Sequence, residues 1–183
     1  RKGFGIVPEL TRRLLSDSLP IEVCIHDCFG IMQSELEQLA KMAIIDNRIS
    51  ITNGAVDATA WAQILDRCDL LVAPYDPRFF ALNNSGVISE AIANGIPIAV
   101  PEHTTLSDLL RDYEFPGVAF PSSTVEDVAK AVRHAIQNYD NLAACAAKAR
   151  HRWATVNGPQ EAARAVLQQF ERPSLAVSEG AAP

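Results

Sequence analysis

The sequence alternates short apolar runs with longer segments of helical periodicity, and this alternation limits the possible folds more than any other feature. The run 70–73 is apolar throughout, which is typical of a central parallel strand buried on both faces. Strands that alternate with helices indicate an α/β fold, a Rossmann-like, doubly wound parallel sheet. The strands are expected at residues 21–26, 49–52, 70–73, 96–101 and 117–120.

Helix-start signals follow several of these runs. Ser34 and Glu37 have the spacing of a capping box, and Ser123 and Glu126 repeat that spacing further along the chain. Asp57 is a candidate N-cap for the helix that carries Trp61. Each of these positions is therefore expected to begin a helix.

Between the expected strands, a helix at about 85–94 is expected to end at Gly95, which can adopt a left-handed backbone conformation.

The C-terminal part of the sequence predicts extra helices beyond the sheet. We expect one domain over residues 1–171 and a disordered tail over 172–183, because the tail has little to bury. The extra helices, both rich in alanine, are expected at about 141–153 and 159–170.

Charge and composition exclude several classes of function. The net charge of −6 gives no electrostatic reason to expect nucleic acid or an anionic membrane as a partner. No apolar run approaches the roughly 20 residues that span a bilayer. The chain begins with Arg1 rather than Met, which suggests a fragment of a longer protein. The cysteines, interpreted as buried free thiols in a reducing compartment, are Cys24, Cys28, Cys68 and Cys145.

The segment from Pro74 to Gly95 carries the candidate chemistry. Ligands of doubly wound sheets bind beyond the carboxyl ends of the strands, and here a polar loop leads from such an end into a helix. Ser85 can cap that helix, and Gly86 lets a ligand approach its unpaired first-turn amides, which favour phosphate. Glu90 lies one turn further and can accept hydrogen bonds from hydroxyls such as those of a ribose. These features fit many nucleotide-binding proteins.

The amino-acid sequence of this segment resembles one family of nucleotide-binding proteins more closely than others. Residues 90–98 read Glu-Ala-Ile-Ala-Asn-Gly-Ile-Pro-Ile, which is similar to the donor-site signature of retaining GT-B glycosyltransferases of the group 1, family 4-like type. Asn53-Gly54, Cys68-Asp69 and the opening Arg1-Lys2-Gly3 also resemble parts of the family's C-terminal domain. The resemblance covers nearly all of residues 1–155 and is most specific over 90–97.

The resemblance implies a role for each matching residue. Lys2 would face the diphosphate of a nucleoside-diphosphate sugar, and Glu90 would bind the ribose; both are expected to act in catalysis. Asn84 and the backbone amides near Ser85, Gly86 and Val87 would line the same donor site. The implied reaction transfers a hexose from a UDP- or GDP-linked donor, with retention and commonly without a metal ion or other cofactor. The acceptor would be held by an N-terminal domain that this chain lacks.

This resemblance also implies a cytoplasmic protein, or one peripheral at the inner face of a membrane through the absent domain. A chain without the acceptor-binding domain would be inactive alone, because donor and acceptor must be held together. The strand expected before Arg1-Lys2-Gly3 is absent from the chain, so either another segment or the parent protein would cover that edge of the sheet.

Two departures from the family pattern keep other interpretations open. Leu82 stands where the family has the first of two glutamates, and residues 83–85 replace its Gly-Phe-Gly. Asp76 or Asn83 could take the lost contact, the donor sugar could differ, or transfer could be weak or lost. The alternatives are a catalytically inactive nucleotide-binding or scaffold module and a sugar-nucleotide epimerase of similar architecture.

Several conspicuous residues are given structural interpretations. Trp61 and Trp153 are interpreted as packing residues, and Lys2 could be an ordinary solvated lysine. His26 and His103 lie on the expected ligand side but are more often structural than catalytic at such positions. The aromatic residues of the long loop, Phe79 and Phe80, fit either a cleft or a domain contact.

Overall fold

A computed structural model describes residues 2–17, 19–30, 32–158, 160–161, 163–164 and 167. The expected tail 172–183 and most of the expected helix 159–170 lie outside the described residues. In the part of the chain that is described, no helix is long and apolar enough to cross a membrane.

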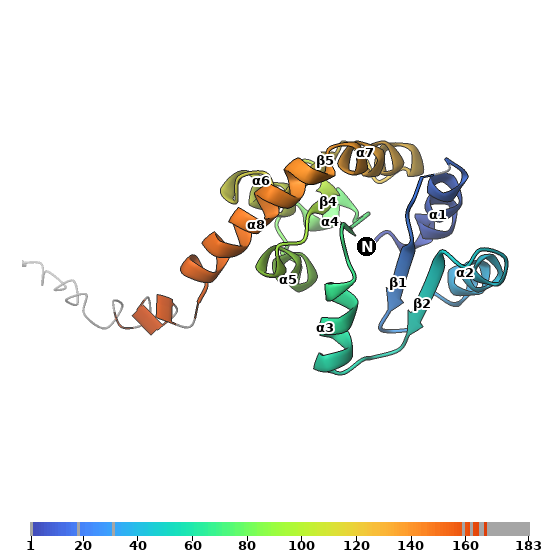
Figure 1. Ribbon diagram of the computed structural model, residues 1–183, viewed down its shortest axis with the longest axis horizontal. Coiled ribbons are helices and arrows are strands. Elements are labelled where there is room, and N and C mark those ends of the chain that lie inside the picture. Colours follow the sequence, from blue (N-terminus) through green and yellow to red (C-terminus); the bar gives the residue numbers. More distant parts are fainter. Residues whose placement is uncertain are drawn as a thin grey trace, which may run out of the picture.

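Parallel strands alternate with helices, as the sequence predicts, and the α/β fold class is confirmed (Figure 1). The strands are β1 (Val23–Asp27), β2 (Ile49–Asn53), β3 (Leu71–Val72), β4 (Ile98–Pro101) and β5 (Gly117–Phe120). The helices are the short 3-10 turn η1 (Phe4–Ile6), α1 (Val7–Ser16), α2 (Gln33–Ile45), α3 (Ala58–Asp66), α4 (Pro77–Phe80), α5 (Gly86–Asn94), α6 (Thr105–Asp112), α7 (Val125–Gln137) and α8 (Tyr139–Val156).

The strands form two sheets within the described residues, in the orders β1-β2 and β3-β4-β5 (Figure 1). A doubly wound sheet commonly has the strand order 3-2-1-4-5-6. The described residues form two runs of neighbouring strands, β2-β1 and β3-β4-β5, with no strand among them that pairs with both.

The core is divided in the same way as the sheet. All of β4 is buried, and large apolar clusters lie on both sides of the β3-β4-β5 sheet. The β1-β2 sheet has a small cluster of its own that α1 and α2 cover, made of Leu15, Ile25, Leu39 and Ile49. β3 is half-buried rather than fully buried as expected, because β4 is the one strand of the described residues that pairs with it.

Several local expectations are corrected. The helix expected at Ser34 begins at Gln33 and has no side-chain cap, and Thr124 rather than Ser123 caps α7 by accepting a hydrogen bond from the Asp127 amide. Asp57 does cap α3, with the Ala60 amide 2.8 Å away, and Gly95 ends α5 with a φ of 73°. Both capping boxes expected from spacing were wrong. In α7 the neighbouring Thr124 has the backbone conformation of an N-cap, and in α2 no side chain of the described residues caps the helix.

The expected burial of the cysteines holds only in part. Cys24 is exposed on the face of β1 opposite to the buried Ile25, and Cys28 is exposed in the loop that follows β1. Cys68 and Cys145 are half-buried, and all four thiols are free. Burial raises the pKa of the Cys68 thiol to about 11.

Candidate functional site

The candidate site begins where the chain leaves β3. Residues 73–75 are buried, and the Tyr75 ring stacks on Phe80 with the ring centroids 4.4 Å apart. The hydroxyl of Ser123, in the loop after β5, donates to the carbonyl oxygen of Tyr75. The chain therefore turns at a fixed point before it enters the short helix α4 and the loop that follows it.

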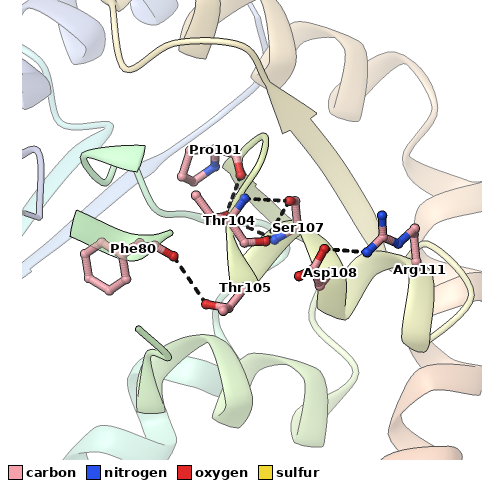
Figure 2. A network of polar contacts seen from close by, with 7 residues as sticks. All are labelled: Phe80, Pro101, Thr104, Thr105, Ser107, Asp108 and Arg111. Atoms are coloured by element: carbon pink, nitrogen blue, oxygen red, sulfur yellow. Dashed lines mark hydrogen bonds and ion pairs between the residues drawn. The ribbon is translucent and has the colours of Figure 1, made fainter. Parts of the chain in front are cut away.

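The start of α6 is tied to the end of α4, as Figure 2 shows, and also to the loop that follows α4. The hydroxyl of Thr105 lies 2.6 Å from the carbonyl oxygen of Asn83 and 3.3 Å from that of Phe80. Thr105 is itself held by a capping box in which Thr104 and Ser107 each accept from the other's backbone amide. The Thr104 hydroxyl also donates to Pro101 at the end of β4. The loop is thus held by Thr105, whereas Thr104 and Ser107 close the first turn of α6.

Ser85 occupies the N-cap position of α5 without capping it. Its backbone is extended, and its hydroxyl lies 3.4 Å from the Tyr75 hydroxyl instead of turning to the first-turn amides. Such amides have no partner within the helix and carry the positive end of the helix dipole. A methyl group added at Gly86 would meet no atom within 4 Å, so the space above the backbone is open. The start of α5 can therefore accept an anion.

Lys2 is placed at this opening by the residue that follows it. Gly3 has a φ of 69°, and a Cβ there would collide with the carbonyl oxygen of Pro74. The backbone at Gly3 therefore packs directly against the backbone at Pro74, just after β3. The Lys2 ammonium lies 5.9 Å from the centroid of the Tyr75 ring, which is within reach of a cation–π contact.

These groups border one open cleft with a volume of about 420 Å³. It brings together every residue for which the resemblance implies a donor-site role. The cation of Lys2 and the unpaired first-turn amides of α5 thus border the same cleft. The lining residues are Lys2, Phe79, Phe80, Asn83, Asn84, Ser85, Gly86, Val87 and Glu90.

Glu90 has a partner that the sequence did not reveal. The indole N–H of Trp61, on α3, donates a hydrogen bond to its carboxylate. Trp61 was expected only to pack, and the two residues are 29 positions apart. The one available signal is general: a partly buried indole N–H usually finds an acceptor. That rule does not identify the acceptor.

Leu82, which stands at the position of the family's first glutamate, and the two residues that could take over its contact lie in different places. Leu82 is 90% exposed and does not line the cleft. Asp76 caps α4 and pairs with Arg78, whose hydrogen bonds hold the pKa of the Asp76 carboxyl below its ordinary value. Asn83 does line the cleft, with its side-chain amide donating to the Phe79 carbonyl oxygen.

The two candidate histidines also differ. His26 lies in β1, with its Nε2 atom 3.0 Å from the carbonyl oxygen of Gly54 and its ring against Trp61. His103 is exposed after β4, with a φ of 57°, and its ionic neighbour in the described part of the chain is Glu102, at 3.9 Å. His26 therefore reaches the surroundings of Glu90, while His103 does not.

The sequence matches the family described as Glycosyl transferases group 1 over residues 2–152. The chain belongs to this family. No curated protein matches it. The cleft described above thus lies in a glycosyltransferase domain whose family match spans all of its lining residues.

Solved glycosyltransferase structures share the fold of this chain. Sucrose-phosphate synthase from Thermosynechococcus elongatus aligns with a TM-score of 0.69 at 17% identity, over 93% of this chain and 42% of that one. A glycosyltransferase from Rickettsia africae gives 0.69 at 14%, over 93% and 44%. HepE from Anabaena in complex with UDP gives 0.63 at 16%, over 87% and 44%.

The chain spans less than half the length of each of these structures. At such low identity the similarity establishes the fold, which is that of the C-terminal domain of GT-B glycosyltransferases.

Proposed function

We propose that this chain is the donor-binding part of a glycosyltransferase and binds a nucleoside-diphosphate sugar linked to UDP or GDP. One observation carries the proposal: Lys2 and the uncapped start of α5 face a single cleft that also contains Glu90. A Lys ammonium and helix N-terminal amides are both suited to a diphosphate. The presence of UDP in the HepE complex supports the same class of ligand.

In this arrangement different residues of the cleft bind the diphosphate and the ribose. Lys2 and the amides of Ser85, Gly86 and Val87 hold the diphosphate, and the Glu90 carboxylate accepts hydrogen bonds from the ribose hydroxyls. When the bond between the sugar and the diphosphate breaks, negative charge builds up on the leaving phosphate. Fixed positive groups that already face that position lower the barrier without having to reorganise.

The proposed reaction is transfer of a hexose to an acceptor held outside this chain. The acceptor-binding domain is part of the proposal, because the chain spans under half the length of its structural neighbours. Proximity of donor and acceptor supplies a large share of such catalysis, so the chain alone should bind the donor without transferring the sugar.

Isothermal titration calorimetry with UDP, GDP and ADP tests the donor site. We expect saturable binding of UDP or GDP, and Glu90→Ala should weaken it by at least about tenfold, since a hydrogen bond to a charged group is worth roughly 1.5–3 kcal/mol. Gly86→Ala is a second, matched variant. Its methyl group has open space in the free protein but would occupy the place of the ligand, so it should reduce binding without lowering stability.

Absence of binding by all three nucleotides, or full affinity in both variants, would contradict the proposal. A second candidate function, a module that binds nucleotide but has lost transfer, is favoured by the exposure of Leu82 outside the cleft. Titration with the glucose conjugate of the nucleotide that binds, UDP-glucose or GDP-glucose, separates the two. A nucleotide sugar that binds no more tightly than its nucleoside diphosphate indicates that the sugar makes no contact, as the second candidate requires.

A further inference from the structure

The carboxylate of Glu90 is held from outside the cleft. Glu90 lines the cleft through α5, whereas the Trp61 side chain that donates to its Oε2 atom belongs to α3. Trp61 is half-buried and packs against the large apolar cluster that also contains Ile88 and Ile92 of α5. Its indole can therefore direct the glutamate without entering the cleft itself.

Trp61 is in turn held by the other sheet. The Trp61 and His26 rings lie with their centroids 5.6 Å apart and their planes tilted by 40°. The His26 Nε2 atom is 3.0 Å from the carbonyl oxygen of Gly54, directly after β2. A continuous series of contacts thus runs from the ends of β1 and β2 through α3 to the carboxylate in the cleft.

The chemistry of the three groups fits this arrangement. An indole N–H is a donor only, so Trp61 cannot replace Glu90 as an acceptor for a ligand hydroxyl. A carboxylate has two oxygens with about four lone-pair sites, so a bond to Oε2 leaves Oε1 free to accept from a ligand. A free glutamate side chain loses rotamer entropy when it binds, and this cost falls if the side chain is already fixed.

We propose that Trp61 is a positioning residue for Glu90: its N–H orients the carboxylate so that it accepts from the ribose hydroxyls of a bound nucleotide. The inference rests on the proposed function, because it assumes that Glu90 binds the ribose. It assigns to Trp61, and to His26 behind it, a part in nucleotide affinity in addition to packing.

A ligand-and-mutant cycle tests the proposal. Wild type and Trp61→Phe, which keeps an aromatic ring but lacks the N–H, are titrated with UDP and with 2′-deoxy-UDP, and with GDP and its 2′-deoxy form. In wild type, removal of the 2′-hydroxyl should weaken binding about tenfold. In Trp61→Phe, UDP or GDP should bind about fivefold more weakly, and removal of the hydroxyl should cost little, because the two losses share one carboxylate.

Trp153→Phe is the matched control. Trp153 lies on α8 and contacts the Tyr113 ring at 5.3 Å between centroids, away from the cleft. We expect it to keep both the affinity and the full dependence on the hydroxyl. A Trp61→Phe chain that loses equal affinity for the native and deoxy ligands would show that Trp61 only packs, and would overturn the inference.

Fluorescence provides a readout that does not require Trp61 to be replaced. The sequence has two tryptophans, so Trp61 is the sole emitter in Trp153→Phe. Nucleotide binding, and Glu90→Gln without nucleotide, should each change the intensity or maximum of its emission, because each alters the acceptor of the indole N–H. Unchanged emission in both cases would overturn the inference. Absence of nucleotide binding by wild type would instead overturn the proposed function itself.

Discussion

Gly3 has a backbone φ of 69°, and its Cα faces the carbonyl oxygen of Pro74 just beyond β3. The sequence alone gives no structural reason for Gly3 or for Gly5. The structure separates them. A side chain at Gly3 would be strained and would collide with backbone, whereas a Cβ at Gly5 would meet only Glu35 Oε1 at 3.9 Å.

We therefore expect Gly3→Ala to lower the free energy of unfolding by at least about 1–2 kcal/mol, the cost of a left-handed conformation for a residue with a Cβ. It should also weaken nucleotide binding, because Lys2 follows the movement of its neighbour. Urea denaturation and calorimetry measure the two effects. Gly5→Ala is the control and should change neither; equal stability of the two variants would refute this account of Gly3.

At the scale of the element, the start of α6 has two neighbouring threonines with different tasks (Figure 2). Thr104 is buried and caps α6 within a capping box, whereas Thr105 is tied to the carbonyl oxygens of the α4-α5 loop. The first contact stabilises a helix, and the second positions the side of the cleft that contains Asn83.

Substitution by valine, which preserves shape but removes the hydroxyl, should separate these tasks. Thr105→Val should weaken UDP or GDP binding about fivefold, roughly the worth of one hydrogen bond, and increase amide exchange in the loop. Thr104→Val should instead lower stability by about 1 kcal/mol through the lost cap and leave the affinity nearly unchanged. Calorimetry and thermal unfolding of both variants decide the matter; the reverse pattern of losses would show that the loop is held by other contacts.

The elements themselves were largely predictable from sequence. β5 matches its expected range, β2 and β4 differ by one or two residues at one end, and β1 differs by one or two residues at both ends, because apolar runs report burial directly. Capping was less predictable, since Ser122, Ser123 and Thr124 are adjacent and only backbone geometry decides which one caps α7. Most residues of the cleft lie within the single segment 79–90, whereas Lys2 was grouped with them only through the family resemblance. Trp61 was not predictable, because its contact with Glu90 joins two elements that only the tertiary fold brings together.

At the scale of the whole molecule, the division of the sheet predicts a division of stability. The β3-β4-β5 sheet has a central strand that is paired on both sides and fully buried. The β1-β2 sheet is a two-stranded ladder over a small cluster, and Cys24 in β1 is exposed. Two-stranded ladders are only marginally stable by themselves, and local opening follows the amount of buried apolar contact.

We expect hydrogen exchange to show this difference. Amides of β1 and β2 should be protected at least about tenfold less than those of β4, a gap of roughly 1.4 kcal/mol in opening free energy. Equal protection would show that the two sheets open as one cooperative unit. Saturating UDP or GDP should narrow the gap in wild type, because a ligand held by Glu90 engages Trp61 and, through its ring, His26 of β1. In Trp61→Phe the ligand should still protect α5 but no longer β1, since the contact that joins the two sheets at this edge depends on the indole N–H.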